Sequence, residues 1–352
     1  MSLEELKSTL ENGEAYLITS NPNIRYLTDF CLDDGYLLVT KKKSIMLADS
    51  RYCEAAGQKA RDCDEILLLK RAGEQLNEML SKLCISTVYT ESANLSVADF
   101  NRIEGMLEAA VFSKKTDGEI SALRRCKKEY EKQRIIAAQR IAEGAFNHIL
   151  TFIKPGVSEK DIRLELEYFM LKNGGDDLSF STIAISGENT SKPHGVPTEK
   201  KVKSGEFVTM DYGAVVDGYH SDMTRTVAVG SVTDKMAEVY ETVLKAQLAC
   251  LDTLAPGVPC KEADAAARSI ISDAGYGDCF GHGTGHGVGI DIHEGPSLSP
   301  RSEAVLQPGD VVTDEPGIYI PGEFGVRIED MAFITDTGYE NLTICEKSLI
   351  VL

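Results

Sequence analysis

A weak internal repeat is the feature of this 352-residue sequence that most constrains its fold. The segment KPGV at 154–157, followed by a helical pattern and a glycine pair, resembles APGV at 255–258, followed by a helical pattern and Gly275. From Pro155 to Pro256 the offset is 101. Farther along, SGEFVT at 204–209 resembles PGDVVT at 308–313 at an offset of 104. Two similarities at nearly one offset predict two repeats of helix, helix and β-hairpin, and hence two pseudo-symmetric halves that face a shared cleft.

The first predicted hairpin covers residues 207–226 and turns at Asp217-Gly218, a strong two-residue hairpin signal. Counting outward from this turn places Asp211 opposite Thr224. Asp222 then becomes a diagonal neighbour of Asp211 on the same face, with Cβ atoms within about 7–8 Å. Two carboxylates in an apolar hairpin repel each other and resist burial, and a bound cation would relieve both effects. A polar hairpin tip with two solvated aspartates explains this stretch equally well.

The second predicted hairpin pairs residues 311–320 with 325–334 around Pro321-Gly322-Glu323. A three-residue loop at this point places Glu315 directly opposite Glu329. The two hairpins together therefore offer four acids that face inward.

The histidines favour a metal site over a polar surface. Five of the six lie between His194 and His293, and three of these stand in the glycine-rich run FGHGTGHGVGIDIHEGP at 280–296. The run is neither a dinucleotide-binding fingerprint nor an HExxH zinc motif. A single histidine is most often a hydrogen-bonded structural group. Three histidines in a flexible run beside four acids instead predict a metal centre.

Charge and cysteine content exclude several classes of partner. The net charge of −18 argues against nucleic acid and anionic membranes. Nine cysteines without a CxxC pair are typical of reduced thiols, and the acidic N-terminus does not read as a signal peptide. These features predict a cytoplasmic protein without a membrane span.

Residues before about 115 alternate strand and helix patterns without a phosphate-binding glycine loop, which predicts an α/β domain. The predicted strands are 15–19, 36–40, 44–48, 65–69 and 87–90, and the predicted helices are 3–10, 52–60, 72–83 and 97–108. Residues 115–123 read as a connector, and 127–152 as a long amphipathic helix.

Five ordered motifs carry a resemblance to the pita-bread metallopeptidases, the group of methionine aminopeptidase, prolidase and aminopeptidase P. They are SGENTSKPHGVPT, MDYGAVVDGYHSDMTRT, GHGTGHGVGIDIHEGP, DEPGIY and VRIED. Upstream, NIRYLT at 23–28 resembles the creatinase-type N-terminal domain. The resemblance implies an α/β N-terminal domain over residues 1–118 and an α+β pita-bread catalytic domain, with an internal pseudo-twofold repeat, over residues 119–352.

The resemblance also implies a set of metal ligands and cofactors. Two divalent ions are expected, with Mn²⁺ favoured over Co²⁺, Fe²⁺ or Zn²⁺ because the donors are mostly oxygen. In the family, the ligand histidine stands seven residues before the histidine of an HE-x-P motif. That motif begins here at His293, so the implied ligand is His286 and not His282. Asp314 departs from the apolar residue or threonine expected before Glu315, and this change removes no ligand. The implied metal ligands are Asp211, Asp222, His286, Glu315 and Glu329.

Catalytic roles follow from the same resemblance. Glu315 is implied to shuttle protons for a metal-bridging hydroxide, and His194 and His293 to contact the substrate carbonyl. The implied substrate-binding residues are His282, Tyr319 and Arg327. Tyr319 and Arg327 are also implied to orient the acids. These three positions separate aminopeptidase P-like enzymes from methionine aminopeptidases.

The implied activity is that of a Xaa-Pro aminopeptidase or dipeptidase acting on short peptides as a homodimer. The sequence leaves open which of the two exopeptidases it is, the native metal, the physiological peptide and the oligomer size. Two alternatives remain: a creatinase-like amidinohydrolase without metals, and a non-catalytic pita-bread module that binds peptides or proteins.

Overall fold

The computed structural model describes residues 2–91, 94–114 and 117–352. The chain forms two compact units, one extending to Arg124 and the other covering Arg125–Leu352. The predicted boundary between residues 118 and 119 falls inside helix α6 (Asp117–Arg125) and stays a prediction. Among the residues described, no helix is long and apolar enough to cross a membrane.

The first unit contains a mixed sheet whose strands run in the order β4-β3-β2-β1-β5-β6. Its strands are β1 (Glu14–Ile18), β2 (Gly35–Thr40), β3 (Ser44–Ala48), β4 (Glu65–Leu68), β5 (Thr87–Thr90) and β6 (Val111–Lys114). Its helices before α6 are α1 (Ser2–Ser8), α2 (Asn21–Thr28), α3 (Cys53–Lys59), α4 (Ala72–Lys82) and α5 (Val97–Met106). Leu76 and Ile103 on the helices pack against Leu17 and Leu38 on the sheet, which forms the core of this unit.

Every strand and helix predicted in this unit is present, with ends within two residues of the prediction. Three elements were not predicted, namely α2, β6 and α6. Helix α2 is short and begins with Pro22 in its first turn, and β6 is an edge strand. The predicted connector is wrong over 117–123, because these residues belong to α6, while residues 115–116 lie outside the described residues.

The second unit repeats one arrangement of helices and strands. Its first half contains α7 (Glu129–Ile149), α8 (Glu159–Lys172), β7 (Asp177–Leu178), β8 (Ile183–Ser186), η1 (Gly187–Ser191), β9 (Glu206–Tyr212), β10 (Ala214–Val216), β11 (Tyr219–His220) and β12 (Met223–Val229). Its second half contains α9 (Asp234–Thr253), α10 (Cys260–Asp273), η2 (Gly277–Cys279), β13 (Gly285–Gly287), β14 (Glu294–Leu298), β15 (Val311–Asp314), β16 (Gly317–Ile320), β17 (Phe324–Arg327), β18 (Asp330–Ile334) and β19 (Tyr339–Asn341).

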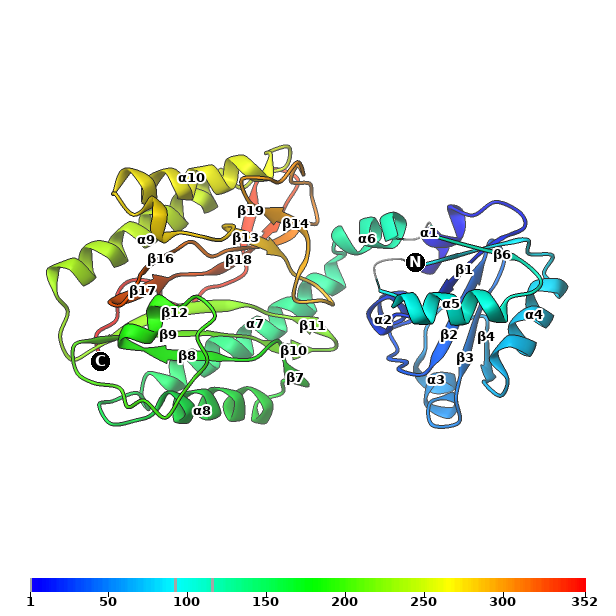
Figure 1. Ribbon diagram of the computed structural model, residues 1–352, viewed down its shortest axis with the longest axis horizontal. Coiled ribbons are helices and arrows are strands. Elements are labelled where there is room, and N and C mark those ends of the chain that lie inside the picture. The colour runs from blue at the N-terminus through cyan, green and yellow to red at the C-terminus, as the bar shows by residue number, and fades with distance from the viewer. Residues whose placement is uncertain (1, 92–93, 115–116) are drawn as a thin grey trace. The chain divides into compact units, whose positions relative to one another are not determined.

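Each half buries its own helix pair mainly against its own strands, and Phe207 and Ala228 of the first half also join the core of the second. Ile149 and Leu166 of α7 and α8 pack with Met210 in one core. Val243 and Ile271 of α9 and α10 belong to the other core, with residues of β15 and β18. Figure 1 shows the strands of this unit lying between the α7–α8 pair and the α9–α10 pair. The predicted repeat of helix, helix and hairpin is therefore present in both halves.

The hairpin registers agree with the predictions. Asp211 pairs with Thr224, and the β16–β17 turn leaves three residues between Ile320 and Phe324. The helix starts differ slightly between the halves. Ser158 caps α8, because its side chain accepts a hydrogen bond from the backbone amide of Asp161. Cys260 is the first residue of α10 and does not cap it, because Pro259 holds the cap position.

Candidate metal centre and active-site cavity

A cavity of about 560 Å³ lies in the second unit, where the two halves meet. It is lined by all five predicted metal ligands, Asp211, Asp222, His286, Glu315 and Glu329. It is also lined by four residues that were predicted to contact or bind substrate, His194, His282, His293 and Arg327. Tyr319 is not among the described lining residues, although it hydrogen bonds to two of them.

Each acid stands where a strand is interrupted. Asp211 lies near the end of β9, and Asp222 immediately precedes β12. The break between β9 and β10 occurs at Gly213, where a Cβ atom would lie 1.9 Å from the carbonyl oxygen of Ser221. In the second half, Glu315 follows β15 and Glu329 immediately precedes β18. The breaks in both hairpins therefore set the acids beside the cavity.

Close packing of glycine-rich backbone brings His286 to the same place. His286 is the central residue of β13, which pairs with β14 on one side and β15 on the other. A Cβ atom at Gly285 would lie 1.9 Å from the Thr313 carbonyl oxygen, and one at Gly287 would lie 2.4 Å from the Gly295 carbonyl oxygen. Only glycine fits on either side of the histidine, because no side chain has room there.

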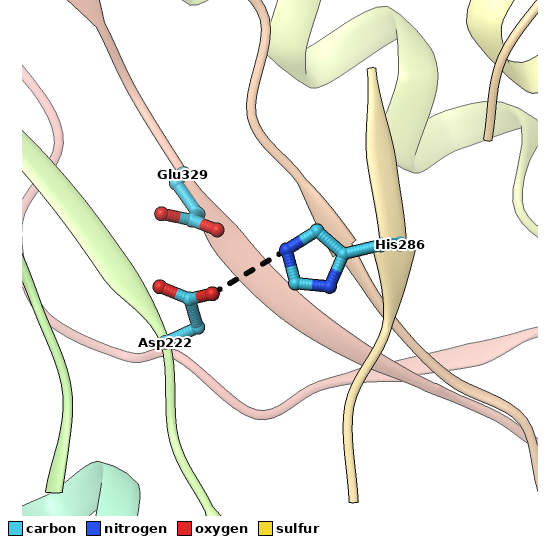
Figure 2. Close-up of side chains that lie close together, drawn as sticks. All are labelled: Asp222, His286 and Glu329. Atoms are coloured by element: carbon cyan, nitrogen blue, oxygen red, sulfur yellow. Dashed lines mark ion pairs between the residues drawn. The ribbon is translucent and has the colours of Figure 1, made fainter. Parts of the chain in front are cut away.

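Asp222, His286 and Glu329 form the tightest cluster of potential ligands, with their donor atoms all within 4.8 Å of one another (Figure 2). The Nε2 atom of His286 lies 3.5 Å from Asp222 Oδ2 and 3.6 Å from Glu315 Oε1. Its Nδ1 atom lies 3.0 Å from the Gly287 carbonyl oxygen. Donation from Nδ1 to that carbonyl leaves Nε2 with a free lone pair directed at the acids.

The cluster lacks the partners that its charge requires. The buried atoms Asp211 Oδ1 and Glu329 Oε1 have no hydrogen-bond donor among the described residues. Burial, followed by repulsion from neighbouring acids, raises the pKa of Asp222 and of Glu329 far above the ordinary range. Burial also raises the pKa of Glu315 to about 8 and lowers that of His286 to about 4. Orphaned buried oxygens beside an unprotonated imidazole are what divalent cations require, so the residues fit a metal centre.

Two further histidines border the cluster from the solvent side. His194 follows η1 and His293 precedes β14, and both side chains are exposed. The rings of His286 and His293 lie 4.4 Å apart between centroids. Both exposed histidines can therefore reach a molecule bound in the cavity.

A chain of hydrogen bonds connects Asp211 to His282. Arg327 Nη2 donates to Asp211 Oδ2 at 2.6 Å, and Nη1 donates to the Tyr319 hydroxyl at 2.9 Å. The Tyr319 hydroxyl lies 2.9 Å from Nε2 of His282. Burial lowers the pKa of His282 to about 4, so its imidazole is neutral at pH 7. In this geometry, Arg327 and Tyr319 orient Asp211 and His282. Direct contact of Arg327 or Tyr319 with substrate stays a prediction.

Two residues that support the site were not predicted to do so. Thr224 donates to Glu329 Oε2 at 2.8 Å and accepts from Arg327 Nε at 3.0 Å. Buried Arg225 donates to the Glu329 carbonyl oxygen and pairs with Asp330 at 2.8 Å. Both stand in the motif MDYGAVVDGYHSDMTRT, two and three residues after Asp222, but that position did not indicate their contacts with the second half.

Asp314 is fully buried in the second half and does not line the cavity. Within the part of the chain that the structure describes, its two carboxylate oxygens have no hydrogen-bond donor other than the weak thiol of Cys250. Burial raises the pKa of Asp314 far above the ordinary range. Burial therefore disfavours the charged form of this carboxyl, which is how Asp314 can occupy a place where an apolar residue is expected.

Comparison with known proteins agrees with this geometry. Residues 133–336, more than half of the chain, match Metallopeptidase family M24, and residues 9–126 match the Creatinase/Prolidase N-terminal domain. The chain belongs to metallopeptidase family M24. Its predicted fold class, an α/β N-terminal domain followed by a pita-bread domain, is thereby confirmed.

Similar proteins match this chain over its whole length. The uncharacterized peptidase YqhT of Bacillus subtilis is 41% identical, with 100% of both chains covered. A Xaa-Pro dipeptidase structure from Bacillus anthracis is 39% identical, with a TM-score of 0.95 and coverage of 100% of this chain and 99% of that one. An X-Pro aminopeptidase structure from Thermotoga maritima is 34% identical, with a TM-score of 0.93 and coverage of 99% and 100%.

Proposed function

We propose that this M24 protein is a metal-dependent exopeptidase that hydrolyses the bond before proline at the N-terminus of short peptides. The observation that carries the proposal is the convergence of four carboxylates and one imidazole in one cavity, with buried oxygens left without donors. The names of the similar proteins, a Xaa-Pro dipeptidase and an X-Pro aminopeptidase, support the same substrate class.

Two divalent ions, Mn²⁺ by preference, are the proposed cofactors. Asp211, Asp222, His286, Glu315 and Glu329 would hold them, and a donor set of mainly carboxylate oxygens suits a hard cation. When bound, such ions lower the pKa of water so that hydroxide is available near neutral pH. They would also offset the mutual repulsion of the four acids.

The chain's own residues would move protons and stabilise charge. Glu315 would accept a proton from the attacking water and pass it to the leaving nitrogen. His194 and His293, both exposed at the cavity, would donate hydrogen bonds to the oxygen of the scissile carbonyl as negative charge develops there. The acidic cluster would attract the free amino group of the substrate, which favours action at an N-terminus.

Proline specificity would come from the part of the cavity wall that His282 forms. A proline imide has no N–H group, and its ring fixes the backbone, so a peptidase for this bond needs a compact pocket for the ring. His282 lines the cavity as a neutral imidazole held by the Tyr319 hydroxyl, and can form one side of such a pocket.

Longer peptides are proposed substrates beside dipeptides. Arg327 is the only arginine or lysine among the described residues that line the cavity. Its guanidinium already donates to Thr224, Tyr319 and Asp211. A dipeptide carboxylate would therefore have to compete with these partners for the arginine, whereas a longer peptide carries no charge at that position.

A peptide panel tests the activity. With saturating Mn²⁺, Ala-Pro and Ala-Pro-Ala should be cleaved faster than Ala-Ala and Ala-Ala-Ala, with alanine released in each case. The substitution His282→Ala should reduce this proline preference more than it reduces Mn²⁺ affinity. Equal rates for the proline and alanine peptides would refute proline specificity, and absence of any metal-dependent cleavage would favour the binding-module alternative. Turnover of creatine without metal would favour the amidinohydrolase.

We also propose a cytoplasmic homodimer. Leu164, Tyr168 and Leu171 lie at helical spacing on α8 and expose 53%, 59% and 47% of their surface, which is typical of a protein contact. Light scattering of the Mn²⁺-loaded protein, alone and with Tyr168→Glu, measures the oligomeric state.

A further inference from the structure

Helix α10 carries a partly buried ion pair next to the segment that holds His282. Asp264 and Arg268 stand one helical turn apart and join through two hydrogen bonds of 2.8 and 2.7 Å. The Asp264 side chain is only 1% exposed, and that of Arg268 is 25% exposed. A surface pair at this spacing usually does no more than support its own helix weakly. This pair also bonds outside its helix.

Arg268 holds the segment that carries His282. Its Nη1 atom donates to the Phe280 carbonyl oxygen at 3.0 Å, and its Nη2 atom donates to the His282 carbonyl oxygen at 2.7 Å. Its guanidinium lies over the Phe280 ring at 4.2 Å, and that ring meets His282 edge-on at 5.0 Å. One cation therefore fixes both the backbone and a neighbouring ring of the residue proposed to wall the proline pocket.

Asp264 holds the next residues of the same segment. Its Oδ1 atom accepts from the amide of Thr284 at 3.1 Å and from the Thr284 hydroxyl at 2.8 Å. The carbonyl oxygen of Thr284 accepts from the amide of Glu315 at 2.7 Å. Asp264 is thus two hydrogen bonds away from the backbone of a proposed metal ligand.

We infer that Asp264 and Arg268 are positioning residues. Arg268 positions His282 and thereby affects the selection of proline. Asp264 acts through Thr284 and positions Glu315. The glycines at 281 and 283 allow this segment many backbone conformations, so its geometry has to come from outside. The bonds from α10 supply that geometry on both sides of His282. The Arg268 part of the inference rests on the proposed function, because it presumes that His282 recognises proline.

The internal repeat offers a matched control. Arg163 and Glu167 on α8 stand 101 positions before Asp264 and Arg268, the offset between Pro155 and Pro256. They form an ion pair of 3.7 Å at the same helical spacing with the charges exchanged. Arg163→Met therefore removes a comparable pair from the other half of the same unit.

The first measurement uses Arg268→Met and Arg268→Lys with Mn²⁺. The ratio of kcat/KM for Ala-Pro over Ala-Ala should fall about tenfold in Arg268→Met and less in Arg268→Lys, while calorimetric Mn²⁺ stoichiometry stays that of the wild type. Arg163→Met should leave the ratio unchanged. An unchanged ratio in folded Arg268→Met, or an equal fall in Arg163→Met, overturns the assignment of Arg268.

The second measurement uses Co²⁺ in place of Mn²⁺, because its visible absorption spectrum reports the geometry of the ligands without any turnover. Thr284→Val and Asp264→Asn should shift that spectrum, and Arg268→Lys and Arg163→Met should not. Identical spectra in all four variants overturn the assignment of Asp264. A wild type without proline preference would refute the proposed function and the Arg268 part together, and the Co²⁺ spectra would still decide the Asp264 part.

Discussion

At the scale of single residues, the site separates groups that can hold metal from groups that can reach substrate. Asp222 and Glu329 are buried, with 5% and 1% of their surface exposed, whereas His194 and His293 are exposed at the cavity. Burial makes charge on the acids costly unless a cation is present, and exposure keeps the two histidines free for a ligand that comes and goes.

This separation predicts different losses from different substitutions. His194→Ala and His293→Ala should each keep full Mn²⁺ stoichiometry and lower kcat by roughly 10²–10³-fold, as expected when a donor to a developing oxyanion is removed. Calorimetric titration and steady-state kinetics on the same samples measure both quantities. Loss of bound metal in either variant, or a near-normal rate with full metal, would contradict these roles.

Removal of metal should expose the cost of burying Glu315. Its folded pKa of about 8 exceeds its ordinary value near 4.5. Between these values the unfolded chain has released the proton and the folded chain has kept it, so the contribution of Glu315 to the free energy of unfolding falls as pH rises and is constant above about pH 8.

The difference in free energy of unfolding between chelator-treated wild type and Glu315→Gln isolates this effect. Histidines such as His286, whose pKa is lowered to about 4, act in the opposite direction below about pH 6.5, but they contribute to both proteins. The difference, wild type minus variant, should decrease steadily from pH 5 to pH 8. A difference that is flat or increases with pH would be inconsistent with a buried protonated Glu315.

At the scale of secondary-structure elements, backbone contacts at glycine decide where His286 lies. Gly285→Ala would place a Cβ atom 1.9 Å from the Thr313 carbonyl oxygen and push β13 away from β15. We expect a loss of about 1–3 kcal/mol or more in the free energy of unfolding, together with weaker Mn²⁺ binding.

The nearby substitution Gly281→Ala is the control, because a Cβ atom there meets nothing within 4 Å. Denaturant unfolding and Mn²⁺ titration of both variants measure the effects. Similar behaviour of the two variants would show that β13 can move without moving the metal ligand.

Much of this level could be predicted from the sequence. Turn chemistry at Asp217-Gly218 and a three-residue loop after Ile320 determine the hairpin registers, and these are local properties. Helix α6 was read as a connector because short segments give little periodic signal. The partners of Arg268 and Arg225 could not be predicted, because they depend on which segments meet in space and not on the residues beside them.

At the scale of the catalytic unit, the proposed metal centre joins the two halves of the repeat. Asp211 and Asp222 come from the first half, and His286, Glu315 and Glu329 come from the second. A cation bound between them stabilises the folded protein in proportion to its binding, because the unfolded chain cannot bring these ligands together.

We therefore expect Mn²⁺ at one hundred times its Kd to raise the free energy of unfolding by about 2.7 kcal/mol. Asp222→Asn and Glu329→Gln, one in each half, should each abolish most of this gain, and the double variant should lose little more than either alone. Thermal unfolding with and without Mn²⁺ measures the effect. Additive losses in the double variant would show that each half binds metal by itself.

The interrupted hairpins also bear on the order of events during protein synthesis. A ribosome makes Asp211 and Asp222 first, and about sixty more residues must follow before His286 is available. Until then the new chain holds only two of the five proposed ligands. With the proposed ligand set, we expect the unfinished chain to bind a scarce cellular cation only weakly, and metal loading to follow the folding of the later half against the earlier one.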